Sequence, residues 1–512
     1  MTLQTPRILL AGTHSGVGKT TLATGIMAAL TRKGLPIQAY KVGPDYIDPS
    51  YHALATGRPS RNLDRWMLGE QLLPVFEKSS EGRWAVIEGV MGLFDGMSGT
   101  RGFGSSADIA KLLQAPVILV VDAANMSRSV AALVHGFCTF DQDLKVAGVI
   151  LNRVKSSAQE VLLREALAEI EVPILGALPK EEAIRLPERH LGLVPSQEKS
   201  FREDFWDELN RVIFSYIDLE KIQEIMLSSA DHEEVTEIAS VRKEVNEEIG
   251  KDVSKNVSND ISKDVSSEKI KKIGDRESKE ENHRMPGVEQ KAATLSKEPK
   301  LRLGVAWDEG FSFYYQDALD QAERMGFSII PFSPLQDSSL PEGLDAVYIG
   351  GGFPELHLER LSQNLSFLES LRAFSNSGKS IYAECGGYMY LGNTITDFEG
   401  RTYPMAGLIP VEAEMTRRLQ GMGYRKGIFQ RDTFLGLAGS TVHGHEFHYS
   451  RVRFQAVETT GDSPAFELFK GECSMRMDGY AKDQIVASYL HLNFAGHPEL
   501  LERWAEQIRR GA

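Results

Sequence analysis

The 512-residue chain contains only three cysteines, Cys138, Cys385 and Cys473, and they show no paired spacing. An odd number of widely separated cysteines argues against a disulfide framework and against a zinc site. This sparing use of cysteine predicts a protein of the reducing cytoplasm.

Long apolar runs are missing as well. A run such as residues 115–124 falls well short of the roughly 20 apolar residues that a membrane-spanning helix needs. The N-terminus has no features of a secretion signal, because Arg7 leads straight into a short strand and a glycine-rich loop. We therefore expect no membrane partner.

Positive charge is in deficit, with 57 basic against 71 acidic residues and a formal net charge of −14. No basic tract stands out that would neutralise a run of phosphates, so nucleic acid is not an expected partner. The sequence leaves the oligomeric state open, and a homodimer is compatible with it.

The chain is long enough for two domains. Short aliphatic runs bounded by glycine recur in its first part and alternate with stretches of helical composition, which predicts buried parallel strands with crossover helices in a three-layer α/β/α domain. The runs are 7–11, 37–42, 84–88, 117–122 and 146–151.

Between the two predicted domains the composition changes. Residues 226–300 are dominated by Ser, Lys, Glu, Asp and Asn, with single Val or Ile residues among charges. Such a segment cannot bury enough surface to offset chain entropy, so we predict a disordered charged linker between domains at 1–225 and 301–512. A marginal amphipathic helix is the alternative.

The second predicted domain is also α/β. Expected strands lie at 301–306, 346–349 and 380–383, and extended segments follow around 446–452 and 485–490.

A glycine-rich loop follows the first strand. The segment Gly12-Thr-His-Ser-Gly-Val-Gly-Lys-Thr-Thr21 leads into a helical stretch at 22–33. Backbone N–H groups of such a loop cradle phosphates, the lysine neutralises the outer ones, and the first threonine hydroxyl is placed to ligate Mg²⁺. The predicted ATP-binding residues are Gly12, Gly16, Gly18, Lys19, Thr20 and Thr21.

Acidic residues follow two other strands of this domain. Asp45 lies in a proline-bounded loop and Glu88 ends a strand, so both point towards the crevice where an α/β sheet binds its ligand. Hard oxygen donors there suit Mg²⁺, and we predict a magnesium site of Thr20, Asp45 and Glu88. Ordinary turn chemistry is the alternative, and Asp122 is a secondary candidate for the acidic partner.

Cys385 sits at the apex of a strand, turn and helix, in Ile381-Tyr-Ala-Glu-Cys-Gly-Gly-Tyr-Met-Tyr390. An elbow of this kind exposes its apical side chain near a helix N-terminus, which favours a thiolate nucleophile. The backbone N–H groups of Gly351 and Gly352, upstream, are predicted to bind an oxyanion. A buried structural cysteine and a plain glycine turn are the alternatives.

A thiolate nucleophile also needs a base. His491 ends the predicted strand Gln484-Ile-Val-Ala-Ser-Tyr-Leu-His491 and is the predicted one. His497 lies beyond that strand, before Pro498, and is set aside. The stretch His443-Gly-His-Glu-Phe-His448 invites a metal interpretation, but we favour a structural role or contact with a ligand.

The second domain resembles class I (triad-type) glutamine amidotransferases, which are flavodoxin-like, and more closely the branch that amidates corrinoid rings. Cys385 and His491 match the nucleophile and its histidine. The usual His-x-Glu is here His491-Leu-Asn493, which leaves the third triad member unidentified.

The first domain resembles the P-loop variant of dethiobiotin synthetase, whose spacing is one residue longer than usual, and Asn152 then matches a residue on the adenine side. Both domains occur in this order, with Lys41-Val-Gly-Pro-Asp45 and the 88–96 segment, in the cobyrinic acid a,c-diamide synthase family.

The resemblance implies an ATP- and glutamine-dependent ligase that uses Mg²⁺ and amidates two carboxylates of a corrinoid or related tetrapyrrole. Asp48 and Asp95 are then expected near the substrate carboxylate. Hydrogenobyrinic acid and nickel-sirohydrochlorin a,c-diamide synthases are close alternatives, and cobyric acid synthase is a more remote one. A nucleotide-gated switch protein with an inactive amidotransferase domain is the alternative from another class.

Overall fold

A computed structural model describes residues 3–97, 102–184, 186, 188–189, 192–193, 204–230, 300–454 and 464–511. The predicted linker at 226–300 lies outside the described residues, apart from 226–230 and 300. The last helix of the first domain, α9 (Leu219–Ser228), extends three residues past the predicted domain end at 225.

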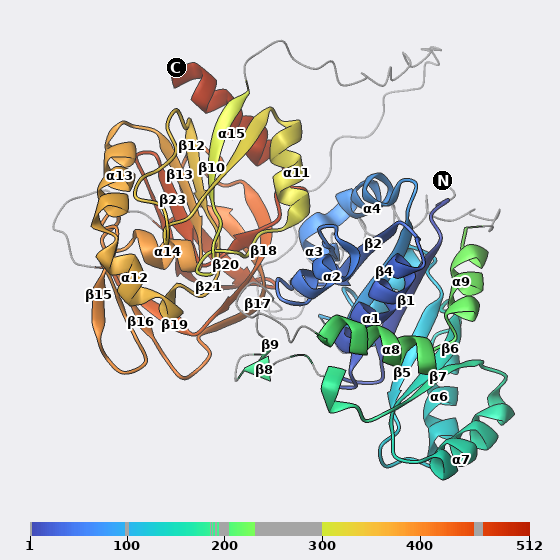
Figure 1. Ribbon diagram of the computed structural model, residues 1–512. Coiled ribbons are helices and arrows are strands. Elements are labelled where there is room, and N and C mark those ends of the chain that lie inside the picture. The colour runs from blue at the N-terminus through green and yellow to red at the C-terminus, as the bar shows by residue number, and fades with distance from the viewer. Residues whose placement is uncertain are drawn as a thin grey trace, which may run out of the picture. The chain divides into compact units, whose positions relative to one another are not determined.

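The first domain is built on a seven-stranded sheet in the order β3-β2-β4-β1-β5-β6-β7, in which neighbouring strands pair in parallel (Figure 1). The strands are β1 (Arg7–Gly12), β2 (Ile37–Val42), β3 (Arg61–Leu63), β4 (Trp84–Gly92), β5 (Val117–Asp122), β6 (Val146–Val154) and β7 (Ile174–Pro179). The five predicted strands are therefore confirmed, with later ends for β1, β4 and β6.

Helices cover both faces of this sheet. Alternate residues of β1 point to opposite sides, so Ile8 and Leu10 pack with one set of helices and Leu9 and Ala11 with the other. The first set is α1 (Lys19–Arg32), α2 (Asp48–Thr56), α8 (Phe205–Tyr216) and α9; the second is α4 (Leu72–Ser80), α5 (Ser106–Leu112), α6 (Ser129–Thr139) and α7 (Ser157–Leu167). The expected three-layer arrangement is present.

The second domain has a six-stranded sheet in the order β11-β10-β12-β13-β23-β22, in which the edge strand β22 alone is antiparallel. Its strands are β10 (Leu301–Ala306), β11 (Phe327–Phe332), β12 (Ala346–Ile349), β13 (Ser380–Glu384), β22 (Tyr480–Lys482) and β23 (Ile485–Ser488). Helices α11 (Gln316–Arg324) and α15 (Pro498–Gly511) pack on one face, and α12 (Leu358–Gln363), α13 (Leu365–Asn376) and α14 (Gly386–Leu391) on the other.

Two further sheets extend this domain, in the orders β15-β14-β16-β19 and β21-β20-β17-β18-β24. Their strands are β14 (Thr394–Thr396), β15 (Thr402–Pro404), β16 (Val411–Met415), β17 (Gly421–Phe429), β18 (Thr441–His448), β19 (Ser450–Phe454), β20 (Phe466–Lys470), β21 (Cys473–Asp478) and β24 (His491–Leu492). Most of these strands were not predicted from the sequence.

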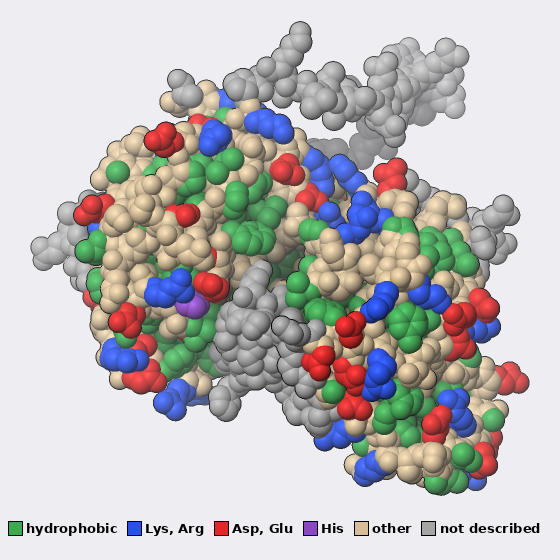
Figure 2. All heavy atoms as spheres, in the orientation of Figure 1, with side chains coloured by type: hydrophobic (Ala, Val, Ile, Leu, Met, Phe, Trp, Pro, Cys, Tyr) green, Lys and Arg blue, Asp and Glu red, His purple; other side chains and the backbone are tan. Residues whose placement is uncertain are grey.

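The surface carries both signs of charge. Figure 2 shows acidic and basic side chains spread over the visible face. Within the described part of the chain, no helix is long and apolar enough to cross a membrane.

Candidate active sites

The glycine-rich loop connects β1 to α1 as predicted. Gly16 and Gly18 have φ angles of 82° and 94°, which favour glycine. A Cβ added at Gly12 would lie 2.6 Å from the Val17 side chain, so the loop also needs glycine for space. Thr20 and Thr21 lie in the first turn of α1, where free N–H groups and the helix dipole favour a phosphate.

Lys19 reaches across the loop. Its Nζ donates to the backbone oxygen of Met91 at 2.5 Å and is 3.4 Å from that of His14. Burial and the neighbouring ammonium of Lys41 lower the pKa of Lys19. Carbonyl partners are readily exchanged for an anion, so the lysine is placed to contact phosphate.

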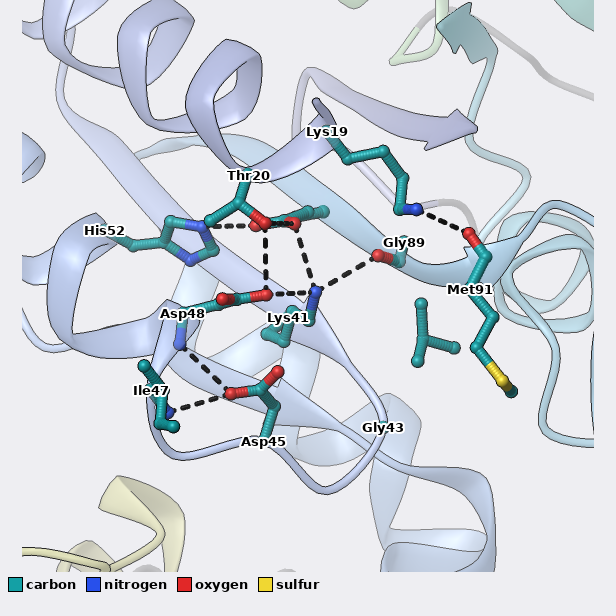
Figure 3. A network of polar contacts seen from close by, with 12 residues as sticks. Lys19, Thr20, Lys41, Gly43, Asp45, Ile47, Asp48, His52, Gly89 and Met91 are labelled. Carbon is teal, nitrogen blue, oxygen red and sulfur yellow. Dashed lines mark hydrogen bonds and ion pairs between the residues drawn. The ribbon is translucent and has the colours of Figure 1, made fainter. Parts of the chain in front are cut away.

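A network of buried charges lies beside the loop (Figure 3). The Thr20 hydroxyl donates to Glu88 Oε1 at 2.7 Å and lies 3.3 Å from Asp48 Oδ2. Lys41 Nζ pairs with Asp48 Oδ2 at 2.6 Å and with Glu88 Oε1 at 3.1 Å. His52 Nε2 contacts Glu88 Oε2 at 2.7 Å.

The charge states in this network follow from their neighbours. Burial alone would raise the pKa of Glu88, but Lys41 and His52 hold it well below its usual range. Burial would lower the pKa of Lys41, but Asp48 and Glu88 raise it. Glu88 is thus an anion with no exposed surface, and it needs a cation beside it.

The oxygens of this network are candidate ligands for Mg²⁺. Thr20, Glu88 and Asp48 bring hydroxyl and carboxylate oxygens together, and Lys41 already shows that a cation is stable between the two carboxylates. These oxygens are of the donor type that Mg²⁺ prefers, and the Lys41 ammonium lies between the two carboxylates. Asp48 joins this group more directly than Asp45, whose Oδ1 accepts the backbone N–H groups of Ile47 and Asp48.

The other predicted residues of this domain have local partners. Asp95 Oδ2 accepts the Gly92 N–H at 2.8 Å. Asn152 donates to the Val17 backbone oxygen at 2.8 Å and packs under Gly18, so in the structure it supports the loop. Asp122 is paired with Arg153 at 2.6 Å.

Cys385 lies at the predicted elbow between β13 and α14. Its φ of 48° is unusual for a residue with a side chain and marks a sharp turn, as nucleophile elbows require. Its backbone N–H donates to Ser488 at the end of β23, at 2.8 Å. The parallel pairing of β13 with β23 therefore sets this residue close to the segment that carries His491.

The two predicted oxyanion glycines adjoin this elbow. A Cβ added at Gly386 would lie 3.2 Å from the Gly352 backbone nitrogen, and one added at Gly351 would lie 2.5 Å from His491 Cε1. Gly351 and Gly352 are therefore brought together with the nucleophile and the histidine. Gly352 has a φ of 156° and faces the Gly310 backbone, so no other residue fits there.

The two histidines near the C-terminus have different surroundings. His497 accepts the backbone N–H of His443 at 3.0 Å and contacts Glu499 at 3.2 Å, so both ring nitrogens have structural partners. His491 is buried beside Gly351, with its ring stacked on His445 at 4.9 Å. These contacts favour His491 as the base.

The ionisation of the Cys385 thiol differs from what the sequence led us to expect. We expected the helix N-terminus to favour a thiolate, but α14 has only six residues. Burial, together with the carboxylate of Glu355, raises the pKa of Cys385 well above its usual value. The thiol is therefore neutral at rest and needs a base to ionise.

The histidine-rich strand β18 is tied down by hydrogen bonds. His445 Nε2 contacts the Tyr315 hydroxyl at 2.7 Å, and His448 Nδ1 contacts the Ser450 backbone oxygen at 2.7 Å. Across the described residues, no group of three or more His, Cys, Asp or Glu side chains could hold a metal ion. These contacts support the structural interpretation.

Sequence reasoning missed three residues of these sites. Lys41 and His52 contact Glu88, and Glu384 lies beside His491. A lysine within the aliphatic strand 37–42 was the one available signal, because an unpaired charge is rarely buried.

Family models match both domains. The CobQ/CobB/MinD/ParA nucleotide binding domain matches residues 8–194, and the CobB/CobQ-like glutamine amidotransferase domain matches residues 302–499. The chain is similar to curated proteins over nearly its whole length.

Among those similar proteins is a cobyrinate a,c-diamide synthase of Caldanaerobacter subterraneus, 38% identical over 98% of this chain and 97% of the relative. The one of Listeria innocua is 40% identical over 97% of this chain and 98% of the relative. A hydrogenobyrinate a,c-diamide synthase of Streptomyces coelicolor is 38% identical, with 98% of each chain covered. With both domains matched and both sites assembled, the chain belongs to the cobyrinate a,c-diamide synthase family.

Proposed function

We propose that this protein uses ATP and glutamine to amidate the a and c side-chain carboxylates of cobyrinate in cobalamin biosynthesis. The observation that carries the proposal is the presence of two assembled sites in one chain. One is a phosphate loop with buried acidic residues, and the other is a cysteine elbow with a histidine and oxyanion glycines.

The second domain supplies ammonia. His491 takes the Cys385 proton, and the sulfur attacks the side-chain amide carbon of glutamine while Gly351 and Gly352 N–H groups bind the oxyanion. The protonated histidine returns the proton to the leaving nitrogen, which departs as ammonia. Water then hydrolyses the thioester, with His491 as base, and glutamate leaves.

The first domain activates the acceptor. A carboxylate is a poor acyl donor, so its oxygen attacks the γ-phosphate of ATP to give an acyl phosphate and ADP, and ammonia then displaces phosphate. Lys19 offsets charge on the transferring group. We propose that Asp48 and Asp95 face the substrate carboxylate. Mg²⁺ held by Thr20, Asp48 and Glu88, with Asp45 close by, would neutralise the phosphates further.

We infer that ammonia passes between the sites without entering solvent, where it would be protonated and unreactive. The described parts of residues 2–233 and 300–512 belong to one compact unit. Within it the ring of Tyr46 lies 5.4 Å from that of His491 and stacks on Phe313 at 4.9 Å. Tyr46 follows Asp45 directly, so one loop contacts both sites, which supports direct transfer.

A second candidate substrate is hydrogenobyrinate. The Streptomyces relative with that name is as similar in identity, at 38%, as the Caldanaerobacter relative named for cobyrinate. The two substrates differ in the central metal of the ring, and the residues that contact the ring are not identified by the phosphate loop or the elbow.

The test is the mass of each macrocycle after incubation with the protein, ATP, Mg²⁺ and glutamine. Two successive amidations of cobyrinate are expected, and preference for hydrogenobyrinate would select the second candidate. A protein that hydrolyses ATP without ever releasing glutamate or amidated product would refute both and favour the switch protein.

Cys385→Ala separates the two half-reactions. It is expected to abolish amidation from glutamine, because no thioester forms, and to leave amidation from ammonium salts within about threefold of wild type. Loss of both activities, in a variant with unchanged thermal stability, would contradict separable sites.

A further inference from the structure

The carboxylate directly before the nucleophile is buried and held by several donors. Glu384, the last residue of β13, is only 1% exposed. Its Oε1 accepts the Tyr382 hydroxyl at 2.7 Å and the Leu492 backbone N–H at 3.0 Å, and its Oε2 accepts the Tyr348 hydroxyl at 2.9 Å. None of these contacts has a role in the mechanism given above.

The fourth neighbour of this carboxylate is the catalytic histidine. Glu384 Oε2 lies 3.5 Å from His491 Nδ1, and no hydrogen-bond partner among the described residues reaches that nitrogen. The other edge of the ring, with Cε1 and Nε2, faces Gly351 on the oxyanion side. The ring therefore turns Nδ1 to Glu384, and its Nε2 lies on the side of Gly351.

The residue in the usual position of the third triad member does not take this role in the structure. Asn493 is buried, its Oδ1 accepts the Ala495 N–H at 3.1 Å, and its Nδ2 lacks a partner among the described residues. His445 stacks flat on His491, with 11° between the rings, and so cannot accept a hydrogen bond from its edge.

We propose that Glu384 is the positioning residue that orients His491 and stabilises its protonated form, in place of the missing glutamate at position 493. The proposal rests on the function proposed above for Cys385 and His491. The third member of the triad then lies next to the nucleophile in the chain instead of two residues after the histidine.

The physical argument follows the general logic of such triads. A carboxylate opposite Nδ1 fixes the tautomer that leaves Nε2 free to take the Cys385 proton, and it offsets the charge of the imidazolium. A contact of 3.5 Å is an ion-pair distance, and catalytic contacts of this kind tighten when substrate binds. Because burial makes the Cys385 thiol harder to ionise, this charge compensation matters more than at an exposed cysteine.

Tyr348, Tyr382 and His445 are buried around Glu384 and His491. Two tyrosine hydroxyls and one backbone N–H donate to Glu384. Burial and the nearby Glu384 carboxylate raise the pKa of Tyr348 and of Tyr382, so both hydroxyls stay protonated. Among the described residues, the titratable rings in contact with His491 are those of His445 and Tyr46. Burial raises the pKa of Tyr46 and lowers that of His445, so both rings are uncharged near pH 7.

The experiment compares Glu384→Gln, Glu384→Asp and Asn493→Ala in the full-length protein. The first measurement is glutamate release, and the second is amidation from ammonium salts. For Glu384→Gln we expect the kcat of glutamine hydrolysis to fall about 10²- to 10⁴-fold with little change in KM, as when a triad aspartate is made neutral. Glu384→Asp is expected to restore part of this activity, and ammonia-dependent amidation is expected to stay within about threefold.

A third measurement separates orientation from general damage. The rate at which iodoacetamide alkylates Cys385 is followed against pH, and in Glu384→Gln its rise is expected to move to higher pH, because the thiol then ionises without a stabilised imidazolium. An unchanged alkylation profile would overturn the proposal, as would Glu384→Gln hydrolysing glutamine within about threefold of wild type.

The remaining outcomes also decide the question. If Asn493→Ala loses glutamine hydrolysis and Glu384→Gln keeps it, the third member is Asn493 and the proposal fails. If Glu384→Gln loses ammonia-dependent amidation and thermal stability as well, its role is structural and the proposal fails. Glutamine hydrolysis persisting in Cys385→Ala would refute the proposed nucleophile itself, which is a different result.

Discussion

Replacing Gly351 with alanine tests the geometry of the elbow at one atom. A Cβ at this position would lie 2.5 Å from His491 Cε1, about 0.9 Å closer than the 3.4 Å at which ordinary contact begins. The backbone φ at Gly351 is not in the left-handed region, so alanine is conformationally allowed and the N–H stays in place. The ring of His491 has to move by about 1 Å.

A misplacement of about 1 Å in a catalytic group costs about 10²-fold in rate. We therefore expect the kcat of glutamine hydrolysis to fall about 10²-fold in Gly351→Ala, measured as glutamate release, while ammonia-dependent amidation is retained. Gly136→Ala is the matched control, because a Cβ there meets no atom within 4 Å. Glutamate release within about threefold of wild type in Gly351→Ala would refute the placement of His491 against this glycine.

Two further predictions concern buried carboxylates. Glu88→Gln removes the negative charge that Thr20, Lys41 and His52 contact. Ammonia-dependent amidation is therefore expected to fall at least about 10²-fold, and calorimetry is expected to show weaker binding of Mg²⁺-ATP. Unchanged binding and turnover would contradict the magnesium site. Glu446 forms ion pairs with Arg425, at 2.5 Å, and with Arg476. Burial alone would raise the pKa of Glu446, but His448 and the two arginines lower it from 4.5 to about 2. The lowered pKa means that ionised Glu446 stabilises the fold above about pH 5, and that about 3 kcal/mol is lost as pH falls from about 5 to 2. Chemical unfolding followed across this range should show the loss in wild type and a much flatter profile in Glu446→Gln, and equal profiles would contradict the assignment.

The parallel core could be predicted because its strands are buried on both faces. Segment 117–122 begins with five aliphatic residues in a row, and the structure has a strand with the same bounds; the predicted strand 37–42 also has the bounds of β2. Apart from the extended segment expected around 446–452, the strands between 394 and 478 escaped prediction because most have one exposed face. In β17 and β21, for example, polar and apolar residues mix without a long run.

The site residues divide in a similar way. Lys19 and Cys385 sit in local motifs where neighbouring glycines set the backbone, so a single segment reveals them. The partners of Glu88 and His491 come from segments far apart in the chain, such as His52 on α2 and Glu384 on β13. No local pattern encodes such pairs. The raised pKa of Cys385 likewise depends on burial by distant segments.

The pairing of β13 with β23 has a consequence for biosynthesis of the enzyme itself. Glu384 is in register with Ser488, a residue made more than a hundred positions later, and His491 follows that strand. A growing chain therefore cannot place its histidine beside Cys385 until almost the entire second domain has left the ribosome, long after the nucleotide domain is complete. On the proposed mechanism, the ability to release ammonia from glutamine therefore arises last, and unfinished chains do not hydrolyse glutamine.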